Sequence, residues 1–269
     1  MRLSALRRCQ AVLFCGQLMP EGPTPVQLKP ATLEAFLAHV RQAEGGMEPT
    51  LAAGRSFLWS DGDPQIAEQV HNGEVVAQFF SSRGPVKIPS GLIHDWVGAA
   101  SIPSVSLDDT LALVQNYDNH KNVYQPEVID SRLISHRGND FQIFLRLLKK
   151  KILTVVLDTD HDVHYRSLSR QRCFCRSYTT RISEVENAGT AREQISAPDT
   201  GYGFLWRLYS YWRFQEREGD VIIECRAISL TRDIPLGLGW IIEPIIEKLP
   251  RESLINTLAA TRRALVPAR

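Results

Sequence analysis

The stretch GLGWIIEPIIEKLPRESLINTLAATRRAL, residues 237–265, is the longest helix-compatible run of the chain and lies almost at its end. Its apolar side chains recur at helical spacing and form one stripe: Trp240, Ile241, Ile245, Leu249, Leu254, Leu258 and Leu265. At about 1.5 Å per residue, a helix of this length spans roughly 40 Å, the full width of a sheet. The hundred residues before it have the pattern of strands and turns. We therefore predict that this helix lies across a curved antiparallel sheet and closes an apolar cavity.

Period-two alternation and turn residues divide the preceding part of the chain into strands. Strands are predicted over 92–103, 128–135, 141–148, 152–157, 163–168, 173–185, 204–214 and 221–231. The sequences HRGND (136–140) and DTDHD (158–162) are predicted turns, and one or two short helices are predicted between 106 and 124. Ser106 followed by Asp109 is a capping signature for the first of these helices. The predicted fold class is α+β, with about seven strands in one antiparallel sheet.

The last predicted hairpin distinguishes the two faces of that sheet. In 204–214 the even positions are mostly apolar, and in 221–227 the odd positions are apolar or small. The opposite face carries a predicted ladder of charges, namely Arg207, Arg213, Glu224 and Arg226, extended by Arg146 and Glu184. Strand 173–185 alternates poorly, which indicates a bulge. Tyr209 and Tyr211 fall on the charged face, where we expect an N-terminal helix to cover them.

We divide the chain into a leader and linker (1–30), an N-terminal extension (31–90) and a main domain (91–266). The extension contains a predicted helix with Leu33, Phe36, Leu37 and Val40 on one face, ending at Gly45-Gly46, and a strand over 74–80. It is too small to form its own core, so we expect it to pack on the main domain. The leader resembles a secretory signal, but Gln10 and Gln17 interrupt its apolar segment. A cytoplasmic location is favoured, and export is the alternative.

Composition indicates an ordinary soluble globular protein. Hydrophobic residues make up 43% and charged residues 23%, with 31 basic against 30 acidic side chains. The formal charge of +1 gives no sign of a nucleic-acid binder, and no segment is apolar over a length that would span a bilayer. Five Cys at irregular spacing favour a reducing compartment.

The sequence DTDHDVH (158–164) is the best candidate for a metal site, because Asp158, Asp160 and Asp162 resemble the start of a calcium loop. Val163 stands where the turn glycine is required, so we interpret the stretch as a polar turn. His161 and His164 would need further ligands to hold zinc. Cys173 and Cys175 are predicted to be small apolar lining residues. We predict no metal and no cofactor.

The order of elements and a local pattern resemble the START-like or polyketide-cyclase/dehydrase superfamily, over residues 91–266. The pattern comprises DDTLALVQNYDNHKNVYQPEVIDSRLI (108–134) and WRFQEREGDVIIECRAISLTRDIP (212–235), which leads into the final helix. This resemblance implies a helix-grip fold that binds a lipid or another apolar molecule between the sheet and the last helix. In some members of the superfamily a reaction takes place there.

From alternation and this resemblance we predict the residues that line the cavity and bind its ligand: Phe141, Ile143, Leu145, Trp206, Leu208, Ser210, Trp212, Ile223, Cys225, Trp240, Ile241, Ile245 and Leu249. The leading hypothesis is a binding or transfer protein for a hydrophobic molecule, with transient membrane contact and no nucleic-acid partner. One alternative is a cyclase, dehydratase or hydrolase that uses Ser210, His94 or Asp95. Another is a filled scaffold whose charged sheet face binds a protein.

Overall fold

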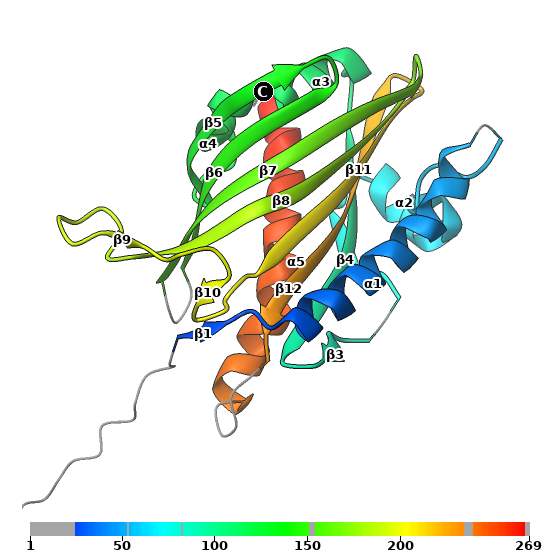
Figure 1. Cartoon of the computed structure of the whole chain (residues 1–269). Helices are drawn as coiled ribbons and strands as arrows, with labels where there is room; N and C mark the ends of the chain where they lie inside the picture. The colour runs from blue at the N-terminus through cyan, green and yellow to red at the C-terminus, as the bar shows by residue number, and fades with distance from the viewer. Residues whose placement is uncertain (1–24, 53, 82, 151–153, 234–238, 267–269) are drawn as a thin grey trace, which may run out of the picture.

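The chain folds around one long antiparallel sheet with a helix on each face (Figure 1). A computed structural model describes residues 25–266 apart from 53, 82, 151–153 and 234–238, and for 239–248 it describes the backbone alone. The helices are α1 (Pro30–Met47), α2 (Pro64–His71), α3 (Leu107–Gln115), α4 (His120–Val123) and α5 (Gly239–Leu265), with 3-10 turns η1 (Glu48–Leu51), η2 (Ser60–Gly62) and η3 (Tyr117–Asn119). The predicted α+β, helix-grip class is confirmed.

The main sheet contains ten strands in the described part of the chain, more than the seven predicted. Its order is β2-β4-β12-β11-β8-β7-β6-β5, with β3 paired to β4 and β9 paired to β8. The strands are β2 (Val76–Phe79), β3 (Val86–Ile88), β4 (Gly91–Ile102), β5 (Val128–Arg137), β6 (Asp140–Lys150), β7 (Thr154–Ser169), β8 (Arg172–Glu186), β9 (Gln194–Ile195), β11 (Arg207–Arg217) and β12 (Asp220–Arg232). Strands β1 (Val26–Gln27) and β10 (Thr200–Gly201) form a separate pair.

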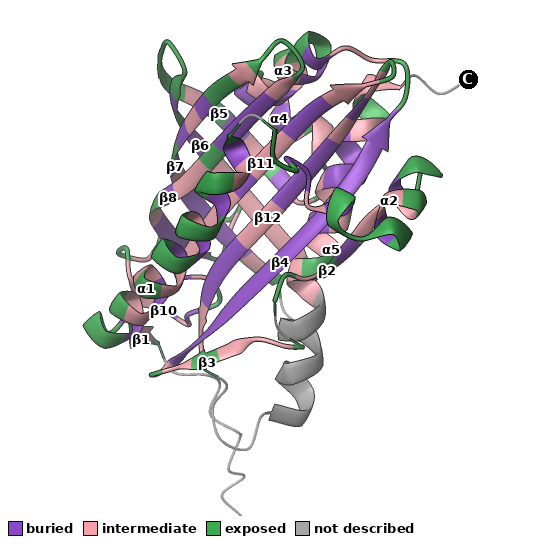
Figure 2. Cartoon of the chain, turned by 90° about the vertical axis from the view of Figure 1, so that its right-hand side faces the viewer, coloured by how far each residue is buried: buried purple, intermediate pink, exposed green. Residues whose placement is uncertain are grey.

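Strand β4 is buried at each of its twelve positions, which Figure 2 shows as a continuous purple strand. Helix α5 packs on one face of β4, through Leu254 and Leu258. On the other face, α1 contributes Phe36 to a cluster that includes Ile93. Because both faces of β4 are covered, its sequence does not alternate between apolar and polar residues as that of a half-exposed strand does.

The contact between α5 and the sheet depends on Gly98 of β4. A Cβ at this position would lie 2.7 Å from the carbonyl oxygen of Val76 and 3.0 Å from Leu258 Cδ1. It would also lie 3.1 Å from Leu254 Cδ2. The absence of a side chain at Gly98 therefore lets the helix lie directly on the strand.

The predicted turn at DTDHD is wrong, because β7 runs without interruption from Thr154 to Ser169. Two of the three aspartates of this stretch, Asp158 and Asp160, are paired with arginines of neighbouring strands, whereas Asp162 is exposed and accepts from Gln142 Nε2 at 3.2 Å. Arg146 Nε donates to Asp158 Oδ1 at 2.7 Å, and Arg181 Nε donates to Asp160 Oδ2 at 2.6 Å. Cross-strand ion pairs of this kind stabilise an extended conformation that the local sequence disfavours.

The predicted bulge in strand 173–185 is confirmed, and it reverses the predicted position of Glu184. The β7–β8 register shifts between the pairs Asp160/Arg181 and His161/Thr179, which leaves Thr180 as the extra residue. Beyond the bulge, Glu184 is opposite Leu157, on the cavity side. Glu184 therefore does not extend the charged ladder, whereas Arg146 does.

Helix α1 does not end at Gly45-Gly46 but continues to Met47. Met47 and Ala43 are buried in the cluster beneath the helix, and this burial offsets the helix-breaking tendency of two glycines. The expectation that an N-terminal helix covers Tyr209 and Tyr211 is confirmed. Phe36 lies edge-on to Tyr209 with ring centroids 5.2 Å apart, and Tyr211 Oη donates to Glu44 Oε1 at 2.9 Å.

Candidate functional site: a cavity between the sheet and helix α5

A cavity of about 610 Å³ lies between α5 and the concave face of the sheet. Apolar side chains of β6, β7, β11, β12 and α5 make up much of its lining, among them Leu145, Leu157, Leu208, Trp212 and Leu254. A volume of this size is within the range of sites for small organic ligands. The space beneath the helix is therefore not filled by side chains.

All of the predicted lining residues except Trp206 fall into three groups. The cavity is lined by Ile143, Leu145, Leu208, Ser210, Trp212, Cys225 and Leu249. Phe141 and Ile223 are buried in the core on the same face of the sheet. Trp240, Ile241 and Ile245 belong to the stretch of α5 whose side chains are not described.

The prediction for Trp206 is wrong, because this side chain is buried in the cluster that α1 covers, on the opposite face of the sheet. Trp206 precedes the first residue of β11, so the strand alternation does not reach it. A turn at Gly203, with φ of 74°, redirects the chain just before it. The backbone N–H of Trp206 donates to the carbonyl oxygen of Leu230 at 2.7 Å, which holds the chain beside β12 just before β11 begins.

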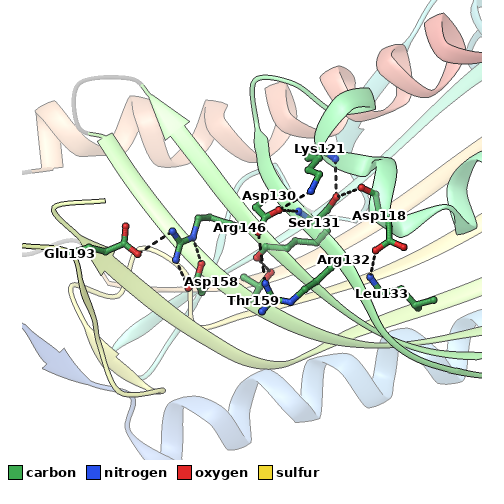
Figure 3. A network of polar contacts seen from close by, with 11 residues as sticks. Asp118, Lys121, Asp130, Ser131, Arg132, Leu133, Arg146, Asp158, Thr159 and Glu193 are labelled. Carbon is green, nitrogen blue, oxygen red and sulfur yellow. Dashed lines mark hydrogen bonds and ion pairs between the residues drawn. The ribbon is translucent and has the colours of Figure 1, made fainter. Parts of the chain in front are cut away.

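The short helices position three aromatic side chains at the cavity wall, namely Tyr117, His120 and Tyr124. Figure 3 shows the polar contacts that hold these helices on β5. The Lys121 N–H donates to Ser131 Oγ at 2.9 Å, and the Leu133 N–H donates to Asp118 Oδ1 at 2.9 Å. Tyr124 Oη lies 3.2 Å from Thr261 Oγ1, so the same segment also contacts α5.

Two sets of hydrogen-bonded polar side chains lie at the cavity wall, and the sequence patterns did not identify either of them. Tyr117 Oη is 2.9 Å from Tyr165 Oη. His161 is bound at both ring nitrogens, to Thr159 Oγ1 at 2.9 Å and Ser177 Oγ at 3.3 Å. Had DTDHD been interpreted as strand, the alternation of Thr159, His161 and Tyr165 would have predicted their inward direction.

Burial determines the charge state of the histidines and cysteines in the cavity lining. It lowers the pKa of His161, His120 and His94 to about 4 each, so all three rings are neutral at pH 7. It raises the pKa of the Cys175 and Cys225 thiols, which leaves them protonated and without nucleophilic character. The cavity wall is therefore polar at a few points and uncharged there.

Lys149 and Glu127 form one pair of charged groups in the cavity lining. Burial lowers the pKa of Lys149, and the neighbouring Glu127 carboxylate raises it. Lys149 forms a salt bridge with Glu127 and donates to Ser253 Oγ of α5 at 2.5 Å. Lys149, near the end of β6, is thus a half-buried contact between the sheet and α5.

The three candidate catalytic residues do not converge. Ser210 and His94 line the cavity, but no hydrogen bond joins them in the described part of the chain. Asp95 points to the opposite face, where it accepts from Arg226 Nη2 at 2.6 Å and lies 2.9 Å from His39 Nε2. Among the residues that the structure describes, no group of three His, Cys, Asp or Glu could hold a metal ion.

Glu184 fixes one end of the cavity wall. Its carboxylate accepts the N–H groups of Tyr202, Gly203 and Phe204 at 2.7, 2.9 and 3.1 Å, and these three residues line the cavity. Burial raises the Glu184 pKa, while the three N–H donors lower it.

Replacing Glu184 by Ala is expected to reduce the free energy of unfolding by about 2 kcal/mol, because the N–H groups of Tyr202, Gly203 and Phe204 lose their acceptor. Chemical denaturation measures this loss. Glu186→Ala, on the same strand but exposed, is the matched control and is expected to change stability by less than about 0.5 kcal/mol. Equal effects of the two substitutions would contradict this role.

The fold and the cavity together define a helix-grip protein with an apolar internal site. No protein-family description and no curated protein matches the sequence. No helix in the described residues combines the length and hydrophobicity needed to cross a membrane.

Solved structures with a similar fold include a STAR-related lipid transfer protein from Xanthomonas axonopodis, with 15% identity and a TM-score of 0.45 over 67% of this chain and 97% of that one. The Zhui aromatase/cyclase of a Streptomyces species is 8% identical, with a TM-score of 0.42 over 64% and 93% of the two chains. Human STARD10 is 11% identical, with a TM-score of 0.41 over 79% and 84%. These similarities concern the arrangement of helices and strands.

Proposed function

We propose that this protein binds a hydrophobic small molecule in the cavity beneath α5, as a carrier without catalytic activity. The observation that supports the proposal is an unfilled space of about 610 Å³ with a largely apolar wall. Transfer of an alkyl group into such a site is favourable by about 0.8 kcal/mol per methylene, so a long chain needs few polar contacts. The separation of Ser210, His94 and Asp95 argues against the catalytic alternative that depends on them.

Native mass spectrometry of the purified full chain tests the proposal. The expected result is a mass above that of the denatured protein, by the mass of one apolar molecule, or stoichiometric uptake of an added long-chain probe. A protein that carries no molecule and takes up none of a set of long-chain alkanes, alcohols and acids would contradict it.

A cavity-filling substitution is expected to block the site. Ser210→Phe places a phenyl ring among Leu208, Trp212 and Cys225, where it displaces roughly three ligand methylenes. At about 0.8 kcal/mol for each methylene, the expected loss in affinity for a bound alkyl probe is roughly 50-fold, measured by titration calorimetry.

Ser210→Ala is the matched control at the same position. It is expected to retain probe affinity within about threefold, because it adds no volume to the cavity. Loss of a catalytic turnover on Ser210→Ala with unchanged binding would instead support the enzyme alternative.

A further inference from the structure

His94 Nδ1 is the one fully buried histidine nitrogen without a hydrogen-bond partner among the described residues, and His94 lines the cavity. The residue lies on β4, and its side chain has 0% exposure. Nε2 is 3.1 Å from Thr231 Oγ1, and Nδ1 has no hydrogen-bond partner. A buried polar atom without a partner costs about 1–3 kcal/mol, so its presence in a binding cavity points to a ligand group that completes it.

The neighbouring hydroxyl determines what that ligand group must be. Thr231 Oγ1 donates its proton to the carbonyl oxygen of Arg232 at 3.2 Å. A hydroxyl has a single proton, so both contacts form together only if Thr231 accepts from the His94 Nε2–H; this arrangement assigns the His94 proton to Nε2. Nδ1 is then a lone-pair acceptor. Burial lowers the pKa of His94 to about 4, so the ring does not gain a second proton at neutral pH.

Ser229 supplies a hydroxyl next to this acceptor. It is the cross-strand partner of His94 in the β4–β12 pairing, and it also lines the cavity. Side chains of directly opposed residues lie about 5 Å apart at Cβ, so one ligand oxygen fits between them. The pair thus offers an acceptor on His94 and a donor on Ser229.

We infer that the cavity selects apolar molecules bearing a neutral hydroxyl, which donates to His94 Nδ1 and accepts from Ser229. This inference rests on the proposed function and specifies its ligand class. A methyl ether of the same alcohol retains the oxygen acceptor but has no proton to donate. A ketone also has no O–H proton, so neither the ether nor the ketone can donate a hydrogen bond to His94 Nδ1.

The full chain is titrated with dodecan-1-ol, dodecyl methyl ether and dodecan-2-one at pH 7.5. The alcohol is expected to bind about fivefold more tightly than the ether or the ketone, the ratio that a net hydrogen bond of about 1 kcal/mol produces. Equal affinities for the three probes would overturn the assignment of His94 and leave the carrier proposal intact. Binding of none of them would overturn both.

Two substitutions separate the two sides of the site. His94→Phe retains an aromatic ring but removes the acceptor, and the alcohol-to-ether ratio is expected to fall to about one. Ser229→Ala removes the donor that serves both probes, so it is expected to weaken alcohol and ether alike and preserve the ratio. A ratio that survives in His94→Phe, or one lost in Ser229→Ala alone, contradicts the assignment.

Nitrogen NMR of the wild-type imidazole provides a measurement that does not depend on the folding of a variant. Addition of dodecan-1-ol is expected to shift the His94 Nδ1 resonance in the direction of a hydrogen-bonded acceptor and to leave Nε2 nearly unchanged. The ether is expected to move neither. An Nδ1 signal that already carries the proton in the free protein would overturn the tautomer and the inference with it.

Discussion

Acidification from pH 6.5 to pH 4 is expected to remove most of the stability of this protein. The cause is the burial of His94, His120 and His161, which lowers the pKa of each from 6.5 to about 4. Above pH 6.5 these rings are neutral in both the folded and the unfolded chain, and stability is fully present. As the pH falls towards 4, the unfolded chain binds up to three protons that the folded chain does not, so folding weakens.

Each extra proton contributes about 1.4 kcal/mol per pH unit, which gives a slope of up to about 4 kcal/mol per unit for the three rings. Over two units the loss is up to about 8 kcal/mol, which is comparable with the roughly 5–15 kcal/mol by which domains are typically stable. Burial raises the pKa of Glu184 and Glu224, which therefore bind protons earlier in the folded chain and offset part of the loss. The free energy of unfolding still rises with pH, because the effect of three histidines exceeds the opposite effect of two carboxylates.

Urea denaturation between pH 7.5 and 4.5 measures this slope. The variant His94→Phe is expected to reduce it by about 1.4 kcal/mol per unit, since one titrating group is removed. Substitution of the exposed His71 by Gln is the control. A free energy of unfolding that stays level down to pH 4.5 would show that these rings are not held neutral by the fold.

Leu258→Ala is expected to reduce the free energy of unfolding by about 4 kcal/mol, within the range for a fully buried leucine. Leu258 has 0% exposure and packs on the bare backbone of β4 at Gly98. Truncation leaves a void between α5 and β4, and neither of these rigid elements can move to fill it. We also expect the variant to bind alkyl probes more weakly, because α5 forms one wall of the cavity.

Chemical denaturation of Leu258→Ala beside Arg263→Ala tests this contact. Arg263 lies on the exposed side of the same helix, and its truncation is expected to cost less than about 0.5 kcal/mol. A cost below about 1 kcal/mol for Leu258→Ala would contradict close packing of α5 on the sheet.

Element order and strand alternation predicted much of this architecture. The terminal helix, the β11–β12 hairpin and the cap at Ser106 lie where local patterns indicated, and Ser106 Oγ accepts from the Asp109 N–H at 3.1 Å. The inward residues of β11 and β12 followed from parity, because a strand with one apolar face has a single register that buries it. The predicted ligand-binding role of these residues stays a prediction.

The wrong predictions share one cause: contacts between residues distant in sequence outweighed the conformational preferences of the local sequence. The aspartates of DTDHD indicated a turn, but Asp158 and Asp160 pair with arginines of β6 and β8 within a continuous strand. One bulge residue, Thr180, moved Glu184 to the other face, and a turn at Gly203 separated Trp206 from the alternation that β11 follows.

Local patterns were enough to predict the fold class, the long terminal helix and the apolar face of the last hairpin, because helical and strand periodicities are local properties of the chain. The space under α5, the neutral histidines and the unpaired Nδ1 of His94 became evident from the folded arrangement alone. Volume, desolvation and hydrogen-bond pairing depend on which distant residues meet. Such properties arise when β4, β7, β12 and α5 come together.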